Sequence, residues 1–193
     1  MNENELIGLL ESLRRMGSDD LSVEVKESAT TLSRDVWETV SAFANTAGGI
    51  IVLGVSERAG FVPVEDFETE KVLNQFVAGM GDAGGRGKLA NPPKYTIERV
   101  ELQGTVVLVI TIEELDPSSK PCYVIERGAQ GGSYKRIDDK DVPLSSTEVL
   151  ALASYGRATP SDRDAVAGAG AEDRKSTRLN SSHSRRSRMP SSA

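Results

Sequence analysis

Residues 36–55 read VWETVSAFANTAGGIIVLGV, in which a helix pattern runs directly into a strand pattern. Apolar residues recur at helical spacing over the first part, which predicts a helix with one inward face. Gly48 can take the positive φ of a helix C-cap, so the helix is expected to end near Thr46. The apolar run at 50–55 has strand length and is rich in β-branched residues. It predicts a strand buried on both faces, in the middle of a sheet.

The flanking sequence predicts alternating helices and strands around this centre. Ser145 or Ser146 can cap a last helix that has Glu148 in its first turn. Gln103-Gly104 separates two apolar runs, which indicates a β-hairpin. Together the patterns predict an α+β fold with a mixed, mainly antiparallel sheet flanked by helices. The remaining expected elements are helices at 3–16, 65–78 and 143–154, strands at 21–26, 95–102, 105–112, 122–126 and 133–137, and a hairpin loop at 128–133.

Composition limits the classes of protein to consider. The chain has 193 residues and 38% hydrophobic content, enough for one domain with a real core. Its single cysteine, Cys122, excludes an internal disulfide and a multi-cysteine metal site. No apolar run approaches the roughly 18 residues of a membrane span, and the acidic, amphipathic N-terminus is not a signal peptide. We therefore expect a cytoplasmic protein without a membrane partner.

Residues 173–193 differ sharply from the rest, being rich in serine and arginine. Their sequence, DRKSTRLNSSHSRRSRMPSSA, resembles the in-frame translation of a common short-read sequencing adapter, so we treat it as an artefactual tail. Removing it takes six basic residues and one acid from totals of 23 and 29, which leaves a formal charge of −11. The only histidine, His183, goes with it, and the native C-terminus is expected to be missing. Residues 155–172 resemble a flexible linker.

Several motifs follow one another along the chain. An acidic pair at 19–20 leads to E-V-K at 24–26, SAFANTAGGIIVLGVSE follows at 41–57, and SKPCYV and SYKR come later. Together they resemble the Schlafen AlbA_2 domain family over about residues 18–152. The family pattern has E-F-K in place of E-V-K, and a glycine where this chain has Asp138. The expected organisation is an N-terminal helix at 1–17, an AlbA_2-like domain at 18–154, the linker and the tail.

The resemblance implies a nucleic-acid-binding domain, for DNA or RNA, in a bacterial transcriptional regulator. In such proteins the domain usually precedes a winged helix or an ATPase-like region, and the family also carries an ATP-binding label. Two alternatives stay open. One is a divalent-metal-dependent RNase or other nuclease, and the other is an ATP-binding, protein-interaction or homo-oligomerisation module that has kept the fold without the chemistry.

The nuclease alternative concerns three carboxylates. Nucleolytic members of the family hold Mg²⁺ or Mn²⁺ with three acids, and the matching positions here are Asp19, Glu24 and Glu57. Glu24 and Lys26 lie two apart on a predicted strand, so their side chains share a face. Glu24 would then hold the metal, while Lys26 would stabilise phosphate charge. The alternative interpretation is a solvated strand face with a weak surface ion pair.

The nucleic-acid-binding candidates are Lys26 and five further residues. Asn45 and the glycines after it could surround a phosphate, or Asn45 could cap neighbouring backbone at a tight corner. The loop at 82–88 lacks the first glycine and the Ser or Thr of a phosphate-binding loop, so it does not predict ATP binding. The remaining candidates are basic or aromatic side chains that would contact phosphates or bases: Arg86, Lys88, Tyr134 and Arg136.

Overall fold

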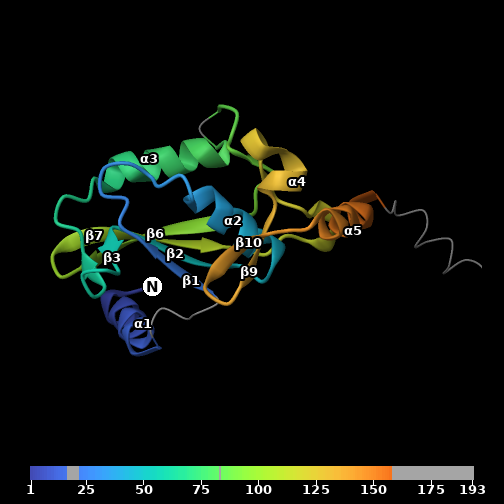
Figure 1. The fold of residues 1–193 in the computed structure, drawn as a ribbon. Helices are drawn as coiled ribbons and strands as arrows, with labels where there is room; N and C mark the ends of the chain where they lie inside the picture. The colour runs from blue at the N-terminus through green and yellow to red at the C-terminus, as the bar shows by residue number, and fades with distance from the viewer. Residues whose placement is uncertain (17–21, 83, 158–193) are drawn as a thin grey trace, which may run out of the picture. The chain divides into compact units, whose positions relative to one another are not determined.

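The centre of the fold is a four-stranded sheet with the strand order β1-β2-β7-β6 (Figure 1). The structure is a computed structural model, and it describes residues 1–16, 22–82 and 84–157. β1 pairs with β2 in parallel, and the other two pairings are antiparallel. This confirms the predicted α+β fold and its mixed, mainly antiparallel sheet. The strands are β1 (Val23–Lys26), β2 (Gly49–Leu53), β6 (Tyr95–Leu102) and β7 (Thr105–Ile112).

The predicted helix-to-strand corner is confirmed. Helix α2 (Val36–Asn45) ends with Thr46 as its C-cap, and the chain turns into β2. Gly48 has a φ of 75°, and its amide donates to the Phe43 carbonyl at 2.8 Å. A Cβ at Gly48 would lie 2.7 Å from the Ile112 carbonyl oxygen, so the corner requires glycine for its φ and for space. β2 lies between β1 and β7, in the middle of the sheet as expected.

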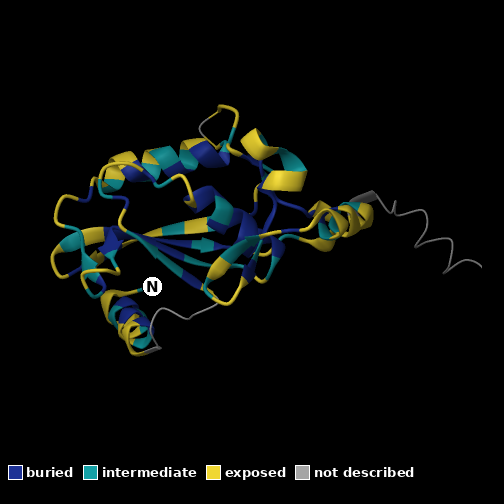
Figure 2. Cartoon of the chain, in the orientation of Figure 1, coloured by how far each residue is buried: buried dark blue, intermediate teal, exposed yellow. Residues whose placement is uncertain are grey.

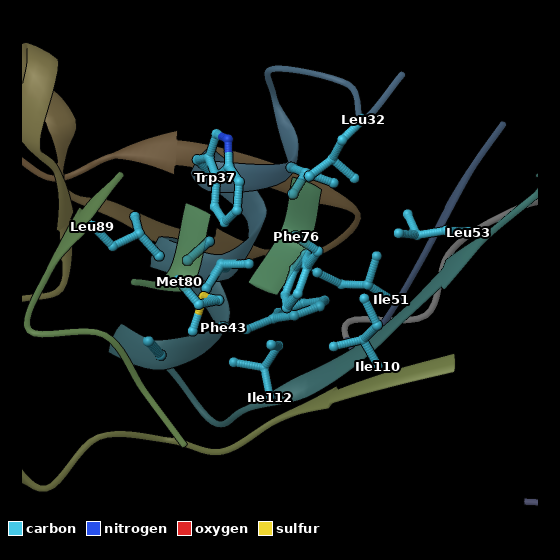
Figure 3. Packing of buried hydrophobic residues seen from close by; sticks show 14 of the residues in the cluster. Leu32, Trp37, Phe43, Ile51, Leu53, Phe76, Met80, Leu89, Ile110 and Ile112 are labelled. Atoms are coloured by element: carbon cyan, nitrogen blue, oxygen red, sulfur yellow. The ribbon is translucent and has the colours of Figure 1, made fainter. Parts of the chain in front are cut away.

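Helices pack on both faces of the sheet. Alternate residues of β2 point to opposite faces, so Ile51 and Leu53 join the core beneath α2 and α3 (Thr69–Met80), whereas Val52 joins the other core. Figure 3 shows the first core, where Phe43 and Phe76 lie over Ile51. The second core lies beneath α1 (Glu3–Met16), on the opposite side from α3 in Figure 1.

The second half of the chain adds short paired strands around this centre. β8 pairs with β5, and β9 pairs with β10, so the hairpin expected between 122–126 and 133–137 is wrong. Residues 128–132 form a short helix, α4, instead of a hairpin loop. Gly132 packs so closely on β8 that a Cβ there would lie 2.5 Å from the Val124 carbonyl oxygen. These elements are β3 (Val55–Ser56), β4 (Val62–Pro63), β5 (Leu89–Ala90), η1 (Pro117–Ser119), β8 (Tyr123–Val124), η2 (Ile125–Arg127), α4 (Gly128–Gly132), β9 (Tyr134–Ile137) and β10 (Lys140–Pro143).

The last described helix is α5 (Ser146–Arg157). Ser145 and Glu148 each bond the other's backbone amide, which confirms the predicted cap. The helix extends past 154, so the predicted linker begins too early, and the rest of that linker and the tail lie outside the described residues. The outer faces of α3 and α5 are largely exposed (Figure 2). No helix in the described ranges is long and apolar enough to cross a membrane.

Candidate functional site

Glu24 and Lys26 lie on β1 opposite Ile51 and Leu53, so their side chains share a face as expected, and this is the face that α2 covers. The ammonium of Lys26 donates to Glu24 Oε1 at 2.9 Å and to Asp35 Oδ2 at 2.8 Å. Burial alone would lower the pKa of Lys26, but the two carboxylates outweigh it and the pKa is raised. The charged side chain of Lys26 therefore links β1 to Asp35 at the start of α2.

Arg136 closes the same cluster from β9. Its side chain is 3% exposed, and its Nη2 and Nη1 donate to Glu24 Oε2 and Asp141 Oδ1, each at 2.9 Å. The guanidinium carbon lies 5.3 Å from the centre of the Phe43 ring, within cation–π range. Burial opposes the charge of Arg136, but Asp141 and Glu24 raise its pKa. We call this set the Arg136 cluster: Glu24, Lys26, Asp35, Arg136 and Asp141.

The described carboxylates do not fit a divalent metal. Each carboxylate oxygen of Glu24 already accepts a hydrogen bond from a cation, Lys26 or Arg136. Glu57 and Asp139 do line the same hollow of about 180 Å³ as Glu24, but Arg136 also lines it and pairs with Glu24, so its charge would oppose a metal there. Asp19, the third expected acid, lies outside the described residues. Among the residues that the structure describes, no three acids, histidines or cysteines could hold a metal together.

Asn45 and Tyr134 lie inside the domain, 9% and 3% exposed. The Asn45 amide donates to the carbonyls of Cys122 and Tyr134, both at 2.9 Å, and its oxygen accepts from the Cys122 amide at 2.8 Å. These bonds use both ends of the side chain to hold β8 and β9 against α2. They match the structural interpretation of Asn45. In this arrangement the side-chain amide of Asn45 is fully used and Tyr134 is buried, and the Nε of Arg136, which has no hydrogen-bond partner, is buried too, so none of the three is accessible to a ligand.

Lys88 lies in an exposed hollow of about 330 Å³, where two arginines that the sequence did not suggest join it. Arg34 comes from the segment before α2, and Arg127 comes from η2. Three separate parts of the chain thus supply cations to one place, and no spacing in the sequence could have connected them. We call this the basic hollow, and Arg34, Trp37, Glu38, Lys88, Val124, Glu126 and Arg127 line it.

Backbone pairing fixes the position of Lys88 in the basic hollow. The pairing of β5 with β8 is extended by a bond from the Ile125 amide to the Lys88 carbonyl at 2.9 Å. The Lys88 amide in turn donates to the Gly79 carbonyl at 2.6 Å, at the end of α3. Lys88 is therefore held beside η2, whereas the neighbouring candidate Arg86 is exposed and does not line the hollow.

A larger groove of about 530 Å³ lies beside β1 and differs in charge. Two cations, Lys26 and Arg58, line it together with three acids, Glu27, Asp35 and Glu57. The basic hollow has the opposite balance, because Glu38 and Glu126 accompany three cations. Of these two sites, the basic hollow therefore has the charge that a phosphate would favour.

Comparisons with known proteins agree with this fold. Two solved structures illustrate the matches. One is the solution NMR structure of the N-terminal domain of a RecG-related protein from Nitrosomonas europaea, a candidate ATP-dependent DNA helicase. It is 28% identical, covers 67% of this chain and 86% of its own, and has a TM-score of 0.52. The other is the DIP2311 protein from Corynebacterium diphtheriae, which is 15% identical over 80% of this chain and 28% of its own, with a TM-score of 0.46.

A search of curated proteins gives no match. The family comparison is more specific, because the pattern described as "Schlafen, AlbA_2" matches residues 19–145. That range runs from the acidic lead-in before β1 to the cap of α5, and it includes every member of the Arg136 cluster and of the basic hollow. The chain therefore belongs to the Schlafen AlbA_2 family.

Proposed function

We propose that the chain is a nucleic-acid-binding domain and that the basic hollow contacts the phosphate backbone. The observation that carries this proposal is the meeting of Arg34, Lys88 and Arg127, from three separate segments, on a domain that is otherwise acidic. Membership of the AlbA_2 family and the likeness to a domain of a helicase-related protein support it. We further propose that the domain is part of a bacterial transcriptional regulator in the cytoplasm.

The aromatic residues near the hollow favour contacts to phosphates over contacts to bases. Trp37 stacks on Phe76, with ring centres 5.5 Å apart, and is 9% exposed. Arg127 covers the ring of Tyr134 at 5.8 Å. With these ring faces covered, the hollow offers cations and little surface for base stacking. We therefore expect binding with little sequence preference, for DNA and RNA alike.

Binding to a local patch on an acidic domain should depend strongly on salt. Three phosphates neutralised on a single strand give a log–log salt slope of about −2. Labelled single-stranded RNA, tRNA and duplex DNA, followed by fluorescence anisotropy at increasing salt, measure this slope. On the single strand, Lys88→Ala should make the slope shallower by about 0.7, because one phosphate contact is lost.

Each test variant has a matched control in the same chain, so the basic tail contributes equally to both. Lys88 and Lys71 are lysines of similar exposure, 51% and 52%, and each pairs with one glutamate. Arg127 and Arg99 match in the same way, at 51% and 52%. We expect Lys88→Ala and Arg127→Ala to weaken binding about threefold or more, and Lys71→Ala and Arg99→Ala to change it less. Equal effects within each pair would refute the basic hollow as the binding surface.

The same assay tests the nuclease alternative when it is run with Mn²⁺ and with EDTA. Uncut strands in both conditions are expected, because the cations around Glu24 oppose a metal. Metal-dependent cutting that disappears in Glu57→Gln would instead establish the nuclease, with Asp19 as the next residue to substitute. Glu57 suits this test because it is exposed and lies outside the Arg136 cluster.

A further inference from the structure

One carboxylate already lies within reach of the cations in the basic hollow. Glu126 Oε1 accepts a hydrogen bond from the Lys88 ammonium at 2.8 Å. That bond lowers the pKa of Glu126, and the positive charges of Lys88, Arg34 and Arg127 lower it further. The carboxylate of Glu126 therefore interacts electrostatically with all three cations that we assign to phosphate binding.

The other acid of the hollow differs from Glu126 in how firmly it is held. Glu38 is 24% exposed, sits in the first turn of α2 and pairs with Arg127 at 2.6 Å. Glu126 is 71% exposed and projects from the short η2 turn. An exposed ion pair such as that between Lys88 and Glu126 contributes little to stability and breaks easily. Glu38 thus fixes Arg127, whereas Glu126 is free to move aside.

We propose that Glu126 occupies the place of a backbone phosphate in the free chain and competes with nucleic acid for the basic hollow. This inference rests on the proposed function, since it assigns a built-in competitor to the same surface. A phosphodiester has several acceptor oxygens and can contact more than one cation at once, so it displaces the single carboxylate. The competition lowers the affinity for every phosphate ligand and leaves the choice of bases unaffected.

The test removes the charge of Glu126 and keeps its shape. Glu126→Gln in the full chain should bind a labelled single-stranded RNA of about twelve nucleotides about twofold to fivefold more tightly. Glu70→Gln is the matched control, because Glu70 is 70% exposed and pairs with the exposed Arg99. It makes the same change in net charge away from the hollow, so its gain should be smaller.

A double variant shows whether Glu126 acts through Lys88. If it does, Glu126→Gln raises the affinity for RNA less in a Lys88→Ala background than in the original chain. Equal gains in RNA affinity for Glu126→Gln and Glu70→Gln would refute the proposal that Glu126 competes with nucleic acid. Weaker binding by Glu126→Gln would refute it as well. If Lys88→Ala still loses more binding than Lys71→Ala, the proposed function survives that result. If Lys88→Ala and Lys71→Ala also behave alike, both proposals fall.

Discussion

The Arg136 cluster and the basic hollow contain the same kinds of side chain and differ in burial. Each combines arginine and lysine with carboxylates at hydrogen-bond distance. The side chain of Arg136 is 3% exposed, whereas that of Arg127 is 51% exposed. Arg136 joins β1, β9 and β10 into one unit, whereas the cations of the hollow face solvent. Burial therefore distinguishes a structural cation from one that is available to a ligand.

The largest effect should come from breaking the buried cluster. Arg136→Ala leaves Glu24 and Asp141, which are 21% and 16% exposed, without their shared cation. We expect the free energy of unfolding to fall by about 3 kcal/mol, because removing one partner of a buried ion pair leaves uncompensated charge. Urea denaturation measures the loss. Arg99→Ala, the exposed counterpart, should stay within about 0.5 kcal/mol.

Similar losses of unfolding free energy for Arg136→Ala and Arg99→Ala would contradict the distinction between buried structural cations and exposed ones. Arg136→Met offers a second check, because methionine fills part of the space beside Phe43 without a charge. It should also destabilise the domain, since Asp141 loses its cation and Glu24 keeps only Lys26.

A somewhat smaller effect is expected from Asn45, the buried neighbour of the cluster. Asn45→Ala removes the bonds of its side chain to the Cys122 amide and the Tyr134 carbonyl, while the Cys122 carbonyl keeps Ser41 as a donor, and the loss should cost about 2 kcal/mol of unfolding free energy. Asn74→Ala is the control, because Asn74 is exposed on α3 and alanine favours a helix. Unfolding midpoints that do not differ between the two variants would contradict the structural role of Asn45.

Local patterns predicted the centre of the fold because the backbone there follows directly from the sequence. The corner before β2 requires glycine at position 48, and alternation along β1 correctly placed Glu24 and Lys26 on a shared face. Residues 122–137 were less predictable, since the partners of β8 and β9 lie elsewhere in the chain. β8 pairs with β5, from which β6 and β7 separate it in the sequence, and β9 pairs with β10, a strand with little apolar pattern.

The candidate site shows the same limit more strongly. Basic and aromatic side chains at 134–136 suggested a ligand surface, but alternation on β9 places Tyr134 and Arg136 inside. Burial depends on what packs over a strand, which a local charge pattern does not contain. Arg34 and Arg127 were missed because each is far from Lys88 in the sequence, and only the folded chain, in which β5 pairs with β8, brings the three to one hollow.

The smallest predicted effect concerns the partly exposed ion pair between Lys135 and Glu148, which also has a structural role. The hydrogen bond from Lys135 and the bonds from Ser145 lower the pKa of Glu148 to about 2, against an ordinary 4.5. Because the folded pKa is the lower one, this stabilisation is complete above about pH 4.5 and is lost as the pH falls toward 2.

Glu148→Gln keeps a capping side chain and removes the charge, so it isolates this contribution. At neutral pH the variant should unfold at slightly lower urea than the original chain, and the difference should shrink between about pH 4.5 and 2. A difference that stays constant with pH would assign the effect to the shape of the cap. A difference that shrinks would show that position at a helix end, as well as burial, gives an ion pair a structural role.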